Sequence, residues 1–467
     1  MSPLNAKIPT TILSFVVFLI IQLFCPKCRL SFKRPLTPAN LAQSFFALQL
    51  LVIPFLLLVY GIELGPLPTL PSNLAINLGL IITICSYLVF AGSYKYFGDK
   101  KPQDYREELL DVWYPTKHMA FLALAYLALG FLGFFLFAGS FGQYIKYLSS
   151  PSYRFYIEEL VSGKLSGALS TFLRPFLGFS IVLVWSLWID KHRFTKNTLV
   201  ISVATILCII LLITVNLGFY YNRGAIVGPI LAVGAAYHLR IRRIPLAILG
   251  SLGGLLFLIL LIFAPYRQTD LVITDLAKRE QLKTLLNSSD TVREIQLYGG
   301  APQFVGYLVE ESGWGLQPYW GKTLFASLLY PIPVLGKQFR ERSGVILYNT
   351  YIYNDPRATD QVVPFSGELF INFHIIGLII GFGLVGLLVA NLQRVFNKSR
   401  NTFEAYCTFL VAIWVAFLVP GSIAVTSQIF VFAFWPIYVY VALCWLRRVS
   451  GKKRLMKIWP TRYVKTT

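Results

Sequence analysis

Long runs of apolar residues, separated by short polar segments, are the main pattern along this chain of 467 residues. Eleven of the runs approach or exceed the ~20 residues that a helix needs to cross the hydrocarbon core of a bilayer. They are Ile8–Cys25, Leu41–Tyr60, Asn73–Gly92, Met119–Ala138, Ala168–Ile189, Thr198–Asn216, Gly224–Leu239, Pro245–Pro265, Ser366–Ala390, Thr402–Val419 and Ser427–Leu446. We therefore predict an all-α polytopic membrane protein, with about eleven transmembrane helices in a single membrane domain over residues 1–467. Gly224–Leu239 is short and begins at a glycine, which makes it the least certain of the runs.

Composition supports this class. Hydrophobic residues make up 56% of the chain and charged residues 13%, and the mean hydropathy is +0.63. Soluble domains are usually about 45–50% apolar and about 25% charged. The first run is long for the core of a signal peptide, and Lys- and Arg-rich sequence rather than a cleavage site follows it, so we expect it to be retained as a span.

The net charge of +21 is distributed unevenly between the loops. About 26 of the 42 Lys and Arg residues lie in one alternating set of segments: 27–34, 95–117, 191–196, 240–243, 394–400 and the tail from 447. The other short loops hold about five. The positive-inside rule then places the N-terminus outside and the C-terminus in the cytoplasm, which requires an odd number of spans. No basic stripe with interleaved aromatic residues is present, so nucleic-acid binding is not expected.

One segment, residues 266–365, forms a large loop on the predicted outer side. Its roughly ten basic residues do not contradict the topology, because long loops are exempt from the charge rule. It is rich in Trp, Tyr, Gly and Pro, and Asp275–Leu286 has helical spacing. We predict an ordered extracytoplasmic lid that lies on the membrane, with the functional site beneath it.

The cysteines do not indicate a metal site. Cys25 and Cys28 are the only close pair, and they lack the second pair of ligands that a structural zinc site needs. No phosphate-binding loop, dinucleotide fingerprint or Asp-x-Asp motif occurs where it could work. We expect neither a metal nor a soluble nucleotide cofactor.

Two arginines lie where predicted spans meet the outer side. Arg223 follows Asn222 and two tyrosines, and its guanidinium can bind a phosphate or pyrophosphate. The alternative is an interfacial arginine that reaches lipid headgroups. Arg267 follows Tyr266 at the exit of the eighth run, where basic residues often merely flank a span. Arg223 is therefore a candidate catalytic residue. Arg267, Asn222 and Tyr266, with Asn372 further along the chain, are candidates for binding the substrate or its pyrophosphate.

A second pair of arginines, Arg340 and Arg342, lies late in the large loop on either side of Glu341. They are further candidates for binding the pyrophosphate. The alternating charges favour the other interpretation, a plain surface patch of ion pairs.

The ninth run opens with polar residues. Glu368 and Asn372 are spaced i, i+4 and therefore share one face of a helix. Glu368 is a candidate general base, and its alternative role is a cap or a partner of the helix dipole. His374 is a candidate catalytic residue or a lone membrane histidine. Further along, Gly377, Gly381, Gly383 and Gly386 form a small-residue face that favours close helix packing.

The segment 222–224, Asn-Arg-Gly, and the segment 366–373, Ser-Gly-Glu-Leu-Phe-Ile-Asn-Phe, flank a large outer loop. In this layout the chain resembles the oligosaccharide repeat-unit (O-antigen) polymerases of bacterial envelopes. By that resemblance Arg223 matches the family's arginine and Glu368 its acidic residue, followed by Asn372 and Phe373. His374 departs from the family, whose members tend to have glycine there.

The resemblance implies a metal-independent glycosyltransferase of the bacterial inner membrane. It would move a growing glycan from undecaprenyl pyrophosphate to the next lipid-linked repeat unit at the outer face. Membrane lipids would surround it, and a chain-length regulator and a flippase would be its protein partners. The alternatives are an O-antigen ligase, a polysaccharide transporter or flippase, and a scaffold for an assembly complex. The enzyme hypothesis predicts that the four arginines and Glu368 converge within about 10 Å, a few hydrogen-bond lengths.

Overall fold

The computed structural model describes residues 8–31, 35–60, 72–99, 116–144, 165–192, 198–220, 223–245, 247–251, 253, 295–296, 299, 302–313, 317–332, 336–353 and 363–458. Regular structure in these residues is entirely helical, as the apolar runs predict, and no strand occurs among them. The prediction of an all-α protein with several apolar helices of membrane-spanning length is confirmed for the described part of the chain.

The helices before the long loop are α1 (Ile8–Phe24), the 3-10 turn η1 (Pro26–Cys28), α2 (Pro38–Ala47), the π-helical η2 (Leu48–Val52), α3 (Ile53–Val59), α4 (Asn73–Asp99), α6 (Thr116–Ala138), α9 (Leu165–Leu173), α10 (Pro175–His192), α11 (Thr198–Tyr220) and α12 (Arg223–Arg240). The long loop contributes α16 (Pro302–Glu311), α17 (Lys322–Leu329), α18 (Gly336–Arg340) and α19 (Gly344–Tyr353). After it come α20 (Phe365–Asn397), α21 (Thr402–Ala416), α22 (Ile423–Phe432) and α23 (Trp435–Ile458).

Ten of the eleven predicted runs coincide with helices or helix pairs, while the eighth, Pro245–Pro265, lies mostly outside the described residues. By length and composition, six described helical stretches can cross a membrane, and α22 with α23 makes a seventh if that bent pair is one span. Helices α1, α12 and α21 are apolar but shorter. The total of eleven spans and their orientation remain predictions.

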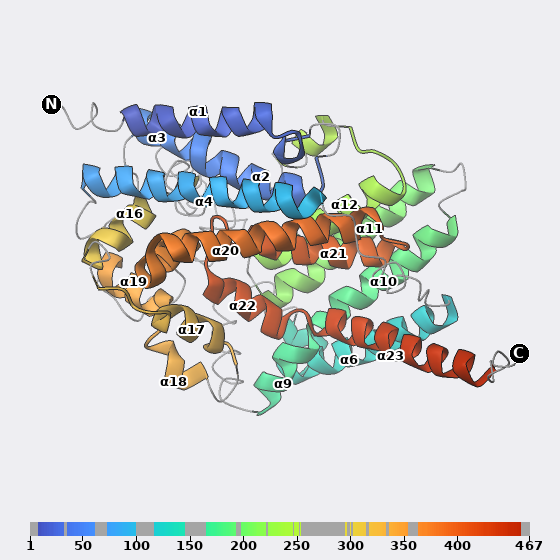
Figure 1. Ribbon diagram of the computed structural model, residues 1–467. Coiled ribbons are helices and arrows are strands. Elements are labelled where there is room, and N and C mark those ends of the chain that lie inside the picture. The colour runs from blue at the N-terminus through green and yellow to red at the C-terminus, as the bar shows by residue number, and fades with distance from the viewer. Residues whose placement is uncertain are drawn as a thin grey trace, which may run out of the picture.

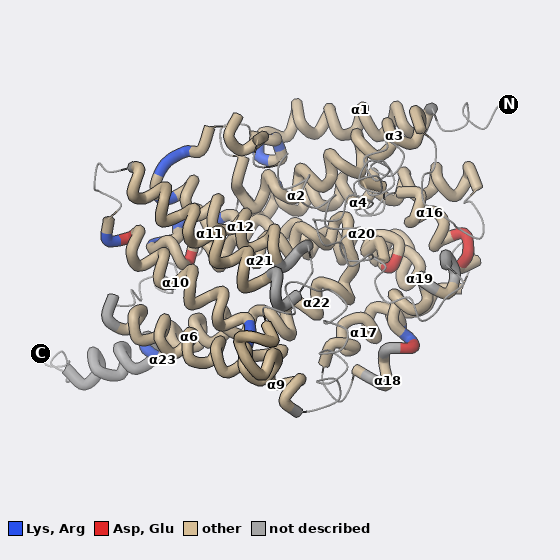
Figure 2. Tube along the Cα trace, turned by 180° about the vertical axis from the view of Figure 1, so that it is seen from behind, with Lys and Arg blue, Asp and Glu red and all other residues tan. Residues whose placement is uncertain are grey.

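The helices pack side by side in one elongated bundle (Figure 1). Helices α1, α4 and α20 all begin at the same end of the bundle, and α16 to α19 gather there. Most of the described Lys and Arg residues lie toward the other end, where the short basic segments are (Figure 2). The described helices of the long loop and most of the described basic residues are therefore at opposite ends of the bundle.

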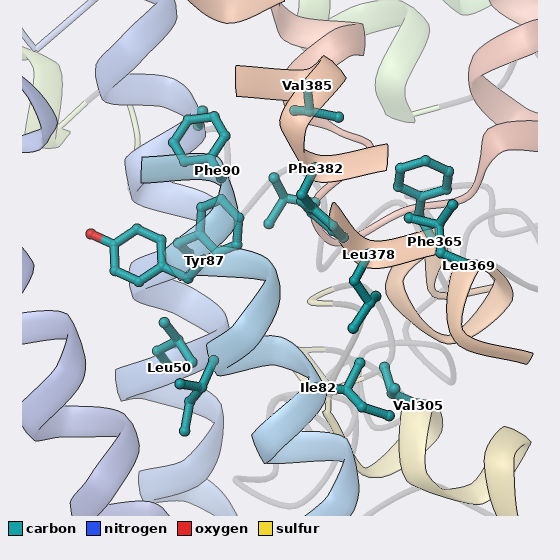
Figure 3. Packing of buried hydrophobic residues seen from close by; sticks show 14 of the residues in the cluster. Leu50, Ile82, Tyr87, Phe90, Val305, Phe365, Leu369, Leu378, Phe382 and Val385 are labelled. Atoms are coloured by element: carbon teal, nitrogen blue, oxygen red, sulfur yellow. The ribbon is translucent and has the colours of Figure 1, made fainter. Parts of the chain in front are cut away.

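Two apolar clusters hold the bundle together. The first is built from α1 to α4, α16 and α20, and Figure 3 shows part of it. It includes the tilted ring pairs of Phe46 with Tyr87 and Phe90, at 4.7 and 5.0 Å between centroids. The second joins α6, α10, α12, α21 and α23 around residues such as Phe179 and Tyr406. Many large apolar side chains on the outer surfaces of α1, α11 and α20 are exposed, as expected where lipid replaces water.

The loop helices are not only a surface lid. Helix α16 is built into the first core: Val305, Leu308 and Val309 have no exposed surface. It crosses α4 where two glycines meet backbone, since a Cβ on Gly306 would lie 1.9 Å from the carbonyl oxygen of Ala75. The predicted lid is thus partly a core element. The helix predicted over Asp275–Leu286 lies outside the described residues.

Two of the long apolar runs are divided into separate helices next to a proline. Helices α9 and α10 are separated at Arg174, because Pro175 fits the first turn of a helix but not its interior. Helices α22 and α23 meet at an angle of 58°, so the run Ser427–Leu446 is a broken helix rather than a straight span. The local cause is the same, since Pro436 lies in the first turn of α23.

Candidate active site

Helix α20 folds back on itself at its start. His374 has φ 51° and ψ −139°, which breaks the helix between residues 365–373, called the hook here, and residues 375–397. The rings of Phe365 and Phe382 are 5.7 Å apart, although a straight helix of ~1.5 Å rise per residue would separate them by about 25 Å. Figure 3 shows Phe365 and Leu369 beside Leu378 and Phe382. The run Ser366–Ala390 is therefore not one straight span, as the sequence analysis assumed.

Small residues in α20 make room for the hook. A Cβ on Gly377 would lie 2.5 Å from the carbonyl oxygen of Leu369, and one on Gly381 would lie 2.4 Å from the Leu369 side chain. Gly386 packs against α4, as predicted for a helix–helix contact, whereas Gly383 faces open space. The glycine face thus serves two purposes, one of which the sequence did not indicate.

The fold-back buries Glu368 completely. Its Oε1 atom accepts a hydrogen bond of 2.9 Å from the hydroxyl of Ser327 in α17. That hydroxyl in turn accepts a hydrogen bond of 3.1 Å from the backbone N–H of Gly344, the first residue of α19. Glu368 lies in the first turn of α20 but does not cap it, since its carboxyl group faces helices of the long loop. Its Oε2 atom has no hydrogen-bond partner among the described residues.

Asn372 lies one turn further along the same face of the hook and is also fully buried. Its Nδ2 atom donates to the hydroxyl of Thr323 at 2.6 Å and to the backbone carbonyl of Glu368 at 2.7 Å. The predicted shared face of Glu368 and Asn372 is confirmed. Thr323 also lies close to the Glu368 carboxyl group. Within the described part of the chain, the Oδ1 atom of Asn372 has no partner.

Several local features hold the loop helices against the hook. A Cβ on Gly344 would lie 2.4 Å from Glu368 Oε1, so only glycine fits beside the carboxyl group there. Ser427 in α22 donates to the backbone carbonyl of Ser327 at 3.0 Å. Gly321, which precedes α17 with φ 81°, lies against the ring of Phe373. The site is therefore assembled from α17, α19, α20 and α22, which are far apart in the sequence.

His374 has a conformational role that the sequence did not indicate. Its backbone lies next to the region of φ and ψ that is essentially restricted to glycine. Its half-buried ring packs edge-on against Phe370, with centroids 5.6 Å apart. The predicted chemical role of His374 stays a prediction.

The predicted arginines are only partly described. Arg223 begins α12, but its side chain lies outside the described residues, as do Asn222, Tyr266, Arg267 and the side chain of Arg340. Arg342 is exposed, two residues before the Gly344 backbone that touches Glu368. The predicted convergence of arginines on Glu368 is therefore untested.

Three residues of interest escaped the sequence analysis. Ser327 and Thr323 carry no local signal, because ordinary hydroxyl residues in a loop helix become informative only through their tertiary partners. Arg174 did carry a signal, since it is a Lys or Arg residue inside one of the eleven apolar runs. It is 8% exposed, and its guanidinium lies 4.3 Å from the centroid of the Phe137 ring. A buried arginine inside an apolar run is unusual, so Arg174 is a further candidate functional residue.

The described residues contain no group of three or more His, Cys, Asp or Glu side chains that could hold a metal ion. Burial raises the pKa of the Cys28 thiol, which donates to the carbonyl of Ala91.

No protein-family model matches the chain, and searches of curated proteins and of solved structures give no significant match.

Proposed function

We propose that this protein is a polymerase of a bacterial cell-envelope polysaccharide, with Glu368 as its general base. The observation that carries the proposal is the carboxyl group of Glu368, which is fully buried, held at Oε1 by Ser327, and open at Oε2. A base must offer an acceptor atom within hydrogen-bond reach of the hydroxyl that it deprotonates. Leaving a buried acceptor unsatisfied costs about 1–3 kcal/mol, so a substrate hydroxyl would recover that free energy.

The two side-chain oxygen atoms without a hydrogen-bond partner favour a ligand that donates hydrogen bonds. With Glu368 ionised, as a general base must be, its Oε2 atom and Asn372 Oδ1 accept hydrogen bonds and donate none. They fit sugar hydroxyls and repel a phosphate. In the proposed reaction the acceptor hydroxyl oxygen bonds to the anomeric carbon of the growing glycan while the bond to the lipid pyrophosphate breaks. The proton passes to Glu368, and the pyrophosphate leaves with the electron pair.

The charge on that leaving group is assigned to arginines, which neutralise pyrophosphate without a metal. We propose Arg223 as the principal contact, with Arg267, Arg340 and Arg342 as further candidates. Asn222 and Tyr266 would contact the same group.

The proposed orientation has eleven spans, an outer N-terminus and a cytoplasmic C-terminus in the bacterial inner membrane. It is supported by the opposite positions of α16 to α19 and of most described basic residues in the bundle (Figures 1 and 2). The hook then lies at the outer end of the bundle, where lipid-linked repeat units would be presented.

A transporter or flippase is the second candidate. Substrate sites of transporters are often formed by interrupted helices. Two interrupted helices meet here, since the backbone N–H of Phe365 donates to the carbonyl of Gly421, just before α22, at 2.8 Å. The long one-sided loop and its contacts with Glu368 favour the enzyme.

The test is chain growth by purified protein in vesicles supplied with lipid-linked repeat units alone. We expect Glu368→Gln to lower turnover by about 100-fold or more, because general-base catalysis typically contributes that much. Glu341→Gln, which alters an exposed carboxyl group of the same loop, is the matched control. Wild-type turnover in Glu368→Gln would overturn the proposal. Growth that requires a lipid A acceptor would indicate a ligase, and translocation of the repeat unit without growth would indicate a flippase.

A further inference from the structure

Two short helices form a polar ladder inside the apolar bundle. Thr323 and Ser327 are spaced i, i+4 on α17, and Glu368 and Asn372 have the same spacing on the hook. The pairs run in opposite directions, with Ser327 bonded to Glu368 at 2.9 Å and Thr323 bonded to Asn372 at 2.6 Å. All four side chains are at most 3% exposed. Such matched spacing gives two hydrogen bonds from one helix contact.

The direction of the hydrogen bond between Ser327 and Glu368 follows from the number of protons available. A serine hydroxyl has one proton to donate. Because Ser327 Oγ accepts from the backbone N–H of Gly344, its proton remains for Glu368 Oε1. The backbone carbonyl of Ser327 shares the proton of the Ser427 hydroxyl in α22 with the carbonyl of Ala424, at 3.0 and 2.9 Å. Ser327 therefore donates from a fixed position.

The hydrogen bond between Thr323 and Asn372 fixes the orientation of the side-chain amide of Asn372. Asn372 Nδ2 donates both to Thr323 and to the Glu368 carbonyl, which uses both of its N–H bonds and turns Oδ1 away from them. The two open acceptor atoms of the hook are thus the ones left over after α17 has occupied Glu368 Oε1 and Asn372 Nδ2.

We propose that Ser327 and Thr323 are positioning residues, and that α17 of the long loop completes the site by orienting Glu368 and Asn372. This inference rests on the proposed function for its effect on catalysis, though not for its geometry. It implies that the site exists only while α17 is seated on the hook. A polar contact at membrane depth favours that seated state, because separating the helices would leave both pairs unsatisfied in apolar surroundings.

The test compares Ser327→Ala, Ser327→Thr and Thr323→Val, with Thr350→Ala as the control for an exposed hydroxyl on a loop helix. We expect Ser327→Ala to lower kcat by about 10- to 100-fold, the range expected for a misplaced catalytic group, with KM changed less than about threefold. Ser327→Thr retains the hydroxyl and should restore most of the turnover. Thr323→Val should have a smaller effect in the same direction. Folding of each variant is checked by its thermal unfolding.

An infrared measurement separates the two proposals. The carboxyl stretching band of Glu368 is assigned as the band that Glu368→Gln removes. Loss of the hydroxyl donor in Ser327→Ala should move this band to higher wavenumber, and Ser327→Thr should return it. An unmoved band in folded Ser327→Ala overturns the positioning role, whatever the enzyme does. A moved band together with full activity of Glu368→Gln would keep the positioning role and overturn the proposed function.

Discussion

Because helix α20 folds back at His374, we predict that glycine at this position gives a more stable protein than alanine, the reverse of the usual order in a helix. A residue other than glycine in a sparsely populated backbone region costs about 1–3 kcal/mol. His374→Ala and His374→Gly both remove the contact with Phe370, but only glycine removes the strain of φ 51°. Glycine also gains about 0.5–1 kcal/mol of unfolded-state entropy, which opposes folding. The difference leaves the glycine variant more stable than the alanine variant by about 0–2.5 kcal/mol.

The matched control is Ile379, which is exposed and lies in the regular part of α20. There glycine should be less stable than alanine by about 1 kcal/mol, the usual helix-propensity difference. All four variants are compared by equilibrium unfolding in mixed detergent micelles. If the glycine variant is less stable than the alanine variant at both positions, residue 374 does not have a positive φ, and helix α20 does not fold back there.

Three further predictions concern packing and chemistry away from Glu368. Gly306→Ala should destabilise the protein by about 1–3 kcal/mol, because its Cβ would meet backbone of α4; Gly92→Ala, which has open space, should be neutral or stabilising in the same unfolding assay. Arg240→Ala should cost about 1.5–3 kcal/mol of unfolding free energy, since this guanidinium donates to two backbone carbonyls that follow α20, whereas exposed Arg242→Ala should change little. Burial raises the pKa of Cys28, so alkylation of this thiol should stay slow from pH 7 to pH 9, where an ordinary thiol ionises, and should speed up only on unfolding. Mass spectrometry of the labelled cysteines checks the last point, and a rate in the folded protein that rises through pH 8.5 would contradict it.

The positions of the helices were predictable because apolar runs and membrane-length helices follow from the same requirement. Asn73–Gly92 became α4, for example, and the helix merely continues to Asp99 in the more polar sequence beyond the run. The break between α22 and α23 was predictable in principle from Pro436, which cannot donate a helical hydrogen bond. Straight spans were assumed because hydropathy does not report on direction.

The hook could not be predicted. A positive φ is expected at glycine, asparagine or aspartate, and nothing in the segment 366–374 marks a reversal at a histidine. The spacing of Glu368 and Asn372 was a sound local inference, since both partners lie on one helix turn. Their contacts with Ser327 and Thr323 join residues about 40 to 50 positions apart, and only packing decides such pairs.

The interrupted helices give a comparison for the two side-chain acceptor atoms of the site that have no hydrogen-bond partner. At membrane depth the backbone groups freed by a break must find partners within the protein. Two backbone groups of the hook do: the N–H of Phe365 donates to the carbonyl of Gly421 at 2.8 Å, and the carbonyl of Ile371 accepts from the N–H of Tyr319 at 3.1 Å. The open acceptor atoms of Glu368 and Asn372, by contrast, represent a cost of about 1–3 kcal/mol each. Two unpartnered acceptor atoms that lie together beside this break support the proposal that the site accepts donor groups from a ligand.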